Sequence, residues 1–517
     1  MVKMRKPNII YILGDDHRAD YTAAAGHPII ETPAFDQLAR EGVYFENAFC
    51  TSPTCTPSRA CHYLGQWERK HGVNFNSDSA LTENAWEKSF PMILKKNGYF
   101  TGWVGKNHVP AGTTGYSSGY FENVFDYWYG NHGHSFFYVK EKKGGRIYSN
   151  ARADTQVEVF EEGVMNFLAP QRDFLNRCAS PLRERPANKP FCLCVTFNLP
   201  HDCGTGDMQL RPADGDLYIT KYRDRFNDFP LPKTYKSRNS ILDPKIPLDV
   251  YNGVLIPQYD YIHTQETMRE KIVRICQTVT GVDRFLGRLR EKLKEIGEDE
   301  NTIIVFSTDH GIHHGEFGLG GKNLLYEPDI RIPLVIYDPR MDKKYTGKKI
   351  SSMTAVPDIA PTLMELLGYE KPASMQGESL MPVIRGEKEK VRNELFTEAI
   401  MDIQNYPRSE SVRGEQFKYI RYFARKEDPA QNHLLYKGTL DDYNTCLNST
   451  LFFGEQPVYE ELYDLQNDKY EEKNLAKDPA HSGELDYYRK RILELGTKAR
   501  EDERNPDTYM NIPGGGL

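Results

Sequence analysis

The stretch Asn8-Ile9-Ile10-Tyr11-Ile12-Leu13, followed by Gly14-Asp15-Asp16, has the pattern of a buried strand that ends at a polar edge. Its apolar run is continuous rather than alternating, as in parallel strands that are covered on both faces. Four later runs have the same continuous apolar pattern: Tyr99 to Val104, Phe191 to Phe197, Thr302 to Ser307 and Ile332 to Tyr337. Together these runs predict a buried parallel sheet.

Helical patterns lie between the predicted strands. Thr32-Pro33 opens one helix with a cap and a proline in the first turn, and Gly42 closes it. A longer helix is predicted from about Thr267 to Ile296, where apolar residues recur at steps of three and four. Strands that alternate with helices predict an α/β sheet with helices on both faces.

The sequence pattern changes after Arg385, where short aromatic segments replace the long apolar runs. Examples are Phe417 to Phe423 and Glu461 to Leu465, which precede a charged helix near the end. A chain of 517 residues is also too long for one compact unit. We therefore predict a large α/β domain over residues 1–385 and a smaller α+β domain with an antiparallel sheet over residues 386–517.

Composition excludes several classes of function. Lys and Arg total 66 against 73 Asp and Glu, and this formal charge of -7 is not arranged in long blocks, so nothing favours nucleic acid or an acidic membrane as a partner. The apolar run after the basic N-terminus is too short for a signal peptide, and no stretch reaches the length of a membrane span. The chain as given is expected to be soluble and cytoplasmic, although a periplasmic or secreted chain without its leader would look the same. The sequence does not indicate an oligomeric state.

The nine cysteines show no disulfide framework and no zinc-binding spacing. Cys192, Cys194 and Cys203 surround an apolar run, and this position favours reduced, buried side chains.

Unusual polar clusters follow the ends of four predicted strands, where open α/β sheets bind their ligands. Because carboxyl ends of parallel strands share one edge, we expect four loops to converge there. The clusters are Asp15-Asp16-His17-Arg18, Gly105-Lys106-Asn107-His108, Pro200-His201-Asp202 and Asp309-His310-Gly311.

Three carboxylates in these loops, Asp15, Asp16 and Asp309, carry like charges that would need a cation. Oxygen-rich sites of this kind suit calcium or magnesium, and calcium tolerates the looser geometry. The alternative at this point is that Asp15 and Asp309 only cap helices.

The segment Cys55-Thr56-Pro57-Ser58-Arg59 predicts the start of a helix that runs towards Leu64, because Pro57 suits a first helical turn. Cys55 would then lie at the positive end of the helix, where backbone N–H groups bind anions, and Arg59 would lie on the same face. For an isolated cysteine, a small buried hydrophobic residue is the preferred explanation.

This segment resembles the signature in which type I sulfatases, members of the alkaline-phosphatase-like superfamily, convert cysteine to formylglycine. The resemblance covers about Pro7 to Arg385 well and the tail loosely. Further blocks are similar to those of the family, in the same order: Asp15-Asp16, Gly105-Lys106-Asn107-His108, Pro200-His201, Ser307-Thr308-Asp309-His310-Gly311 and Gly321-Lys322-Asn323-Leu324-Leu325-Tyr326-Glu327.

The resemblance implies a large α/β/α sandwich with a mostly parallel central sheet and a smaller C-terminal α+β domain, which agrees with the periodicity. It also implies one divalent metal, calcium before magnesium, and a formylglycine produced from Cys55 by a formylglycine-generating maturase. The implied metal ligands are Asp15, Asp16, Asp309, His310 and modified Cys55.

The resemblance further implies that the hydrated aldehyde at position 55 attacks sulfur with one oxygen, and that its second hydroxyl later expels sulfate. His201 and Lys322 would then stabilise or protonate the leaving group, and His108 would be the base for sulfate release. Lys106 and Arg59 would hold the charge of the hydrate and of the sulfate.

The expected function is hydrolysis of a sulfate monoester, with a sulfated sugar or other sulfated small molecule as substrate. Trp103 and the run Asn131-His132-Gly133-His134 are candidates for contacts with the sugar, although ordinary packing and loop roles explain each of them individually. Two alternatives stay open: a phosphate or phosphonate ester hydrolase of the same superfamily, and a non-catalytic relative that binds anionic glycans with Cys55 unmodified.

Overall fold

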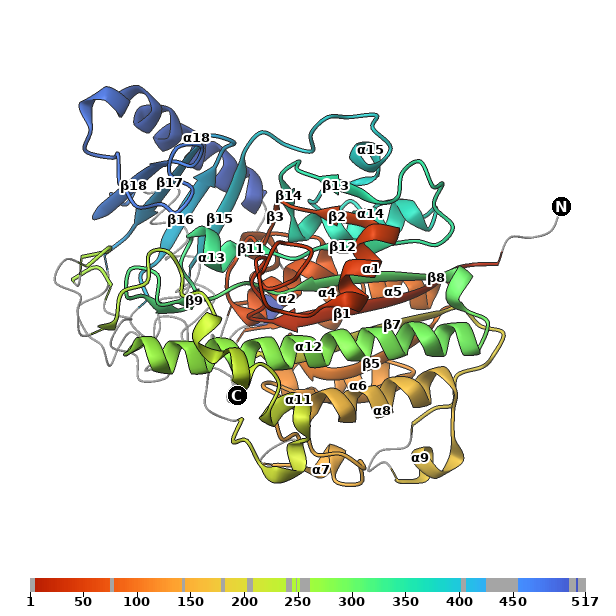
Figure 1. Ribbon diagram of the computed structural model, residues 1–517. Helices are drawn as coiled ribbons and strands as arrows, with labels where there is room; N and C mark the ends of the chain where they lie inside the picture. The colour runs from red at the N-terminus through yellow and green to blue at the C-terminus, as the bar shows by residue number, and fades with distance from the viewer. Residues whose placement is uncertain are drawn as a thin grey trace.

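The fold is organised around one mixed sheet, which runs through the centre of the computed structural model (Figure 1). The structure describes residues 5–74, 79–141, 145–177, 182–201, 208–238, 244–247, 249–251, 261–400, 406–424, 454–501 and 508–509. The sheet has eight strands in the order β13-β2-β12-β8-β1-β7-β5-β6. Their bounds are β1 (Asn8–Asp15), β2 (Val43–Phe45), β5 (Phe100–Asn107), β6 (Tyr127–His132), β7 (Phe191–Pro200), β8 (Thr302–Thr308), β12 (Val335–Tyr337) and β13 (Lys348–Ile350).

The central strands are parallel, as the continuous apolar runs predict. β1 pairs in parallel with β7 on one side and β8 on the other, and β5 pairs in parallel with β7 and β6. The prediction of a buried parallel sheet is therefore confirmed for these strands.

The run from Ile332 to Tyr337 differs from the prediction of a parallel strand. Ile332 belongs to a separate short strand, β11 (Arg331–Ile332), and Pro333, which has no N–H to donate, interrupts the run. β12 begins only at Val335 and is antiparallel to both β8 and β2. Apolar content indicated a buried strand here, but it carries no information on strand direction.

Helices cover both faces of the sheet, and alternate side chains of β1 point into two different cores. Ile10 and Ile12 pack with α1 (Pro33–Glu41), α8 (Gln156–Leu168) and α12 (Gln265–Glu295). Ile9, Tyr11 and Leu13 pack with the helices of the opposite face. These are α2 (Cys55–Leu64), α5 (Phe90–Lys96) and α14 (Ile359–Leu366).

The two predicted helix boundaries are close to those observed. α1 begins at Pro33 and Gly42 follows its last residue, as predicted. α12 begins two residues before the predicted Thr267, because the hydroxyl of Thr264 accepts a hydrogen bond from the Thr267 N–H and caps the helix.

The C-terminal part forms a four-stranded antiparallel sheet that packs against α18 (Ser482–Arg500) around a third core, which includes Tyr419 and Ile492. Its strands are β15 (Leu395–Ala399), β16 (Ser409–Arg413), β17 (Phe417–Tyr422) and β18 (Tyr459–Asp464). The aromatic segments thus form the predicted α+β unit, while the boundary at residue 385 stays a prediction.

A buried ion network ties this antiparallel sheet to the segment that follows α2. Arg69, in α3 (Glu68–His71), pairs with Glu398 of β15 and Glu410 of β16. Arg421 of β17 also pairs with Glu410, at 2.5 Å between Nη2 and Oε2. Removing one partner would leave buried charges uncompensated, so this network fixes the antiparallel sheet against the segment that carries α2 and α3.

The remaining elements are short and lie mainly in the connections. They are β3 (Ala48–Phe49), β4 (Ala80–Leu81), β9 (His313–His314), β10 (Gly320–Gly321), β14 (Thr354–Ala355), β19 (Thr508–Tyr509), α4 (Glu83–Trp86), α6 (Tyr120–Val124), α7 (Gly145–Tyr148), α9 (Arg172–Arg177), α11 (Asp216–Ile219), α13 (Glu327–Ile330) and α15 (Met381–Ile384).

Cysteines in the described residues are buried free thiols, and these include Cys192 and Cys194, as predicted. Cys203 lies outside the described residues. Within the same residues, no helix has both the length and the apolar character that crossing a bilayer requires.

Candidate active site

The strand order places the polar loops side by side. β8, β1, β7 and β5 are consecutive in the sheet, so the residues after their carboxyl ends meet at one edge. Asp15 and Lys106 lie in the last residues of β1 and β5, and Asp309 and His201 directly follow β8 and β7. The structure therefore brings together the four segments that the sequence places after strands.

Asp15 lies at the centre of this cluster and is completely buried. Its Oδ2 accepts hydrogen bonds from Lys106 Nζ at 2.5 Å and from Arg59 Nη2 at 2.8 Å. Burial alone would raise the pKa of Asp15, but the Lys106 and Arg59 cations hold this pKa well below its usual range. Asp15 is therefore an anion that is held in place by two cations.

Cys55 is the first residue of α2, as the position of Pro57 predicts. Its Sγ lies 3.6 Å from Oδ1 of Asp15 and 3.1 Å from Nζ of Lys322. The same Lys322 Nζ donates to Oδ1 of Asp16 at 3.1 Å. The thiol thus lies at the positive end of a helix, between a carboxylate and an ammonium group.

Arg59 fixes α2 against the strand ends. Its Nε donates to Oδ2 of Asp309 at 3.0 Å, and its Nη2 also donates to the carbonyl of Gly14 at 3.1 Å. Ser58 Oγ donates to the backbone carbonyl of Asp309 at 2.5 Å. One guanidinium therefore links the ends of β1 and β8 and orients the turn that carries Cys55.

The donor set fits a hard divalent cation. One ligand atom each from Asp15, Cys55, Asp309 and His310 lie within 4.8 Å of one another, and all four residues are buried. Asp16 adjoins this group, with its Oδ1 3.3 Å from Nδ1 of His310. The carboxylates of this set are ligands that calcium and magnesium prefer, and the Cys55 thiol is its one soft donor.

Asp16 has a backbone φ of 62°, in the left-handed region that side chains other than glycine adopt rarely. Aspartate tolerates this region better than most residues, and such strain concentrates at functional sites.

Three histidine rings form a row that reaches the carboxylates of the site, since ligand atoms of His201, Asp15 and Asp16 lie within 4.8 Å of one another. The ring of His134 lies 4.8 Å from the ring of His108 and 4.8 Å from the ring of His201, centroid to centroid. Burial and the Lys106 ammonium hold the pKa of His108 and His134 well below its usual value, and burial and the Lys322 ammonium do so for His201. All three imidazoles are therefore neutral near pH 7.

The proton of His201 can be assigned from its neighbour. Asn198 Nδ2 donates to Nδ1 of His201 at 3.3 Å, which places the ring proton on Nε2. A neutral His201 can thus donate one hydrogen bond from Nε2.

His134 is the residue that sequence reasoning did not separate from its neighbours. Trp103 packs in the aromatic core and is 1% exposed, and Asn131 is buried and accepts hydrogen bonds from Ser135 and Tyr148. Only His134 of these candidates reaches the rings of the site. β6 lies beside β5 and is parallel to it, so the loop after β6, which carries His134, lies at the same edge of the sheet. This position is the signal that could have identified His134.

Solved structures of other proteins share this fold. A protein solved in complex with its substrate D-glucosamine-2-N,6-O-disulfate aligns over 97% of this chain and 100% of that chain, with 21% identity and a TM-score of 0.66. The phosphonate monoester hydrolase of Agrobacterium radiobacter aligns over 96% of both chains, with 20% identity and a TM-score of 0.70. At these identities the likeness shows the fold alone.

Sequence comparison identifies the family within that fold. The sulfatase family model matches residues 7–369, and the model of the N-sulphoglucosamine sulphohydrolase C-terminal region matches residues 315–437. The N-acetylglucosamine-6-O-sulfatase of Bacteroides thetaiotaomicron is 27% identical over 480 residues, which cover 81% of this chain and 79% of that protein. The chain belongs to the sulfatase family and is a sulfuric ester hydrolase.

Proposed function

We propose that this protein hydrolyses a sulfate monoester on a sugar of a glycan, with N-acetylglucosamine-6-sulfate as the first candidate substrate. The observation that carries the proposal is the position of Cys55 at the start of α2, with Lys322 Nζ at 3.1 Å and the Asp15 carboxylate at 3.6 Å. The named activity of the Bacteroides thetaiotaomicron relative supports the choice of sugar.

Two groups complete the site in this proposal. A formylglycine made from Cys55 by a maturase would supply the oxygen nucleophile, and a divalent cation, calcium before magnesium, would neutralise sulfate oxygens. The residues that would hold the cation are Asp15, Asp16, Asp309, His310 and modified residue 55.

The fixed cations have a clear part in this proposal. Lys106 and Arg59 both donate to Oδ2 of Asp15, so they orient the proposed metal ligand and add positive charge where sulfate oxygens would lie. Because these groups are buried and already hydrogen-bonded, they need little reorganisation when charge develops.

The histidines divide between the two proton-transfer steps. His108 is neutral because burial and Lys106 lower its pKa, and a neutral imidazole suits the base for sulfate release. His201 is neutral as well, so it would stabilise the departing oxygen by donating from Nε2, while the Lys322 ammonium adds the positive charge.

The substrate class is tested by comparing esters with the same leaving group, because a phosphonate monoester hydrolase shares the fold. We expect kcat/KM for 4-nitrophenyl sulfate to exceed kcat/KM for 4-nitrophenyl phosphate and for 4-nitrophenyl phenylphosphonate by about 100-fold or more. This ratio corresponds to a difference in activation free energy on the order of 3 kcal/mol. A phosphorus ester that reacts faster than the sulfate would overturn the proposed substrate class.

His201→Ala is expected to slow esters with poor leaving groups selectively. Loss of a group that stabilises the leaving oxygen costs about 10²- to 10⁴-fold when the alcohol is a sugar hydroxyl. Nitrophenolate needs no such help, so 4-nitrophenyl sulfate should lose about tenfold or less. The measurement is kcat for both substrates in parent and variant, and an equal loss on both would contradict a leaving-group role.

His134→Ala tests the proposal that His134 contacts the sugar. No hydrogen bond to a described residue occupies its ring nitrogens, and the ring is partly exposed between His108 and His201. Losing one hydrogen bond to a sugar hydroxyl should lower kcat/KM for the sulfated sugar about 10- to 100-fold, whereas 4-nitrophenyl sulfate, which has no such hydroxyl, should change much less.

His132→Gln is the matched control for this experiment. His132 lies two residues away, where its ring contacts Glu122 at 2.8 Å and Asn107 at 2.9 Å instead of the site histidines. The ratio of the two activities should stay near that of the parent. If His134→Ala leaves this ratio unchanged, His134 does not contact the sugar.

A further inference from the structure

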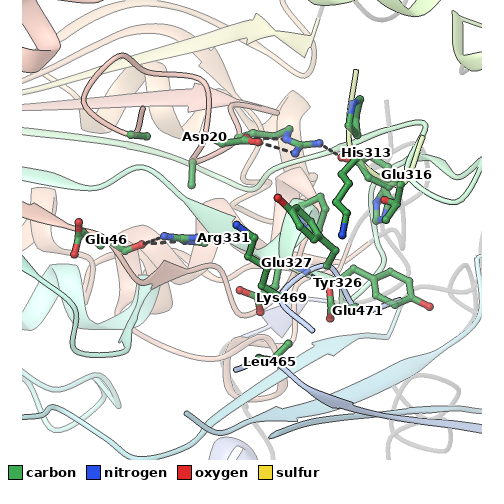
Figure 2. A pocket seen from close by; sticks show the side chains of 18 of the residues that line it. Asp20, Glu46, His313, Glu316, Tyr326, Glu327, Arg331, Leu465, Lys469 and Glu471 are labelled. Carbon is green, nitrogen blue, oxygen red and sulfur yellow. Dashed lines mark hydrogen bonds and ion pairs between the residues drawn. The ribbon is translucent and has the colours of Figure 1, made fainter. Parts of the chain in front are cut away.

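A second pocket lies on the same edge of the sheet as Cys55, displaced towards β2 and β12. Its volume is about 560 Å³, within the range of about 300 to 1,000 Å³ that is common for small-ligand sites. The pocket is lined mainly by the loop after β1 with the end of β2, by residues 313–331 and by residues 465–471 of the C-terminal part, with further contributions from residues 232–234, Lys349 and Arg413. Figure 2 shows Asp20, Glu46, His313, Arg331 and Lys469 around this space.

One wall of the pocket comes from the loops that also carry the proposed metal ligands. Arg18, two residues after Asp16, pairs with Glu316 at 2.5 Å and with Asp20 at 2.8 Å. Glu316 follows His310 in the loop after β8. A ligand in this pocket would therefore touch the loops that position the reacting groups.

The carboxylates that line the pocket are already paired with cations. Arg18 contacts both Asp20 and Glu316, and its single charge offsets one of these two carboxylates. The other pairs are Glu327 with Arg413 at 2.9 Å, Glu471 with Lys418 at 2.8 Å and Glu46 with Lys349 at 3.8 Å.

Two lining cations, Arg331 and Lys469, have no ion pair with a carboxylate among the described residues. Arg331 donates from Nε and Nη2 to the backbone carbonyl of Glu46, at 2.9 and 2.6 Å, and its charge also helps to lower the pKa of Glu327 without a direct ion pair. Lys469 Nζ lies over the ring of Tyr470, 4.8 Å from its centroid. Among the described lining residues, six Lys and Arg face five Asp and Glu, so the pocket has one positive charge in excess, which suits an anion.

The pocket also offers an aromatic surface. Tyr470 is 39% exposed, and Lys233 Nζ lies 4.6 Å from its ring centroid on the pocket wall. Phe317 lines the same space, whereas Tyr326 is 1% exposed and its hydroxyl donates to Glu461. Aromatic faces beside cations and hydrogen-bonding groups suit a ring that is apolar on one face and carries an anionic substituent.

We propose that this pocket binds a sulfated sugar unit of a glycan chain, with Arg331 and Lys469 on its sulfate and Tyr470 against the sugar ring. The proposal shares its ligand class with the proposed function, but it concerns binding at a second place and does not require hydrolysis. Its consequence is that an oligosaccharide should bind more tightly than the isolated monosaccharide.

Binding is tested on the full chain with Cys55→Ala, which prevents turnover. The probe is a size-defined heparin tetrasaccharide, and its desulfated form is the comparison. Arg331→Ala and Lys469→Ala should each weaken the dissociation constant about tenfold, because each removes one charge-assisted contact. Lys344→Ala is the matched control, since Lys344 is exposed, pairs with Asp342 and does not line the pocket.

Hydrogen exchange locates the binding. The tetrasaccharide should protect amides in residues 465–471, and Lys469→Ala should remove this protection without a change in thermal unfolding, since Lys469 is exposed. An unchanged dissociation constant in both variants, the absence of protection at 465–471, or equal binding of the desulfated probe would overturn the proposal. Failure of the proposed function would appear separately, as no sulfate release by the parent chain.

Discussion

Cys55→Ala is expected to reduce hydrolysis of a sulfate ester by about 10⁴-fold or more, because the variant cannot form the proposed nucleophile. Position 55 lies at the start of α2, where Lys322 and the Asp15 carboxylate are its polar neighbours. No other described cysteine has these contacts, so another thiol cannot replace it. The measurement is kcat/KM for 4-nitrophenyl sulfate on protein made in a host that contains the maturase.

Cys276→Ala is the control for loss of a buried thiol. Cys276 is buried in α12, outside the site, and its removal should affect stability but not the rate per folded molecule. Activity of Cys55→Ala within about tenfold of the parent would contradict the role of residue 55, since loss of a nucleophile costs far more.

Removal of divalent ions is expected to abolish activity and to lower thermal stability. Asp15, Asp16 and Asp309 gather around one point with His310, and these carboxylates repel one another when no cation binds between them. Dialysis against a chelator should lower kcat by about 100-fold or more, since the ion stabilises transition-state charge by several kcal/mol. Calcium should restore it more effectively than magnesium.

The stability of the folded protein reports this binding without any turnover. At a free calcium concentration 100 times the dissociation constant, binding contributes about 2.7 kcal/mol to the free energy of unfolding. Asp309→Asn should remove most of the calcium-dependent shift in the unfolding temperature. Full activity in a sample that metal analysis shows to be free of divalent ions would contradict the proposed site.

The sequence predicted most of the central architecture because the physical signals are local. The apolar run Asn8 to Leu13, the Thr32-Pro33 cap and Pro57 each report the conformation of their own segment. The direction of β12 could not be predicted, because it depends on how the chain returns to the sheet and not on local composition.

The sequence predicted the site only through residues at the carboxyl ends of parallel strands, which meet at one edge of the sheet. Residue spacing places Arg59 on the face of Cys55, but its contacts with both Asp15 and Asp309 depend on the packing of α2 across three strands. His134 can be assigned to the site only when the position of β6 in the sheet is known. The second pocket likewise joins Arg18, Arg331 and Lys469 from distant parts of the chain. No local pattern contains that information.

Mass spectrometry of the tryptic peptide 41–59 from the native host tests the central claim, that residue 55 is a nucleophile made by oxidation of cysteine. The peptide holds Cys50 and Cys55 and no internal Lys or Arg, so Cys50 is an internal control for alkylation. We expect one alkylated thiol, at position 50, and an aldehyde at position 55. Two alkylated thiols in protein that hydrolyses sulfate esters would contradict it.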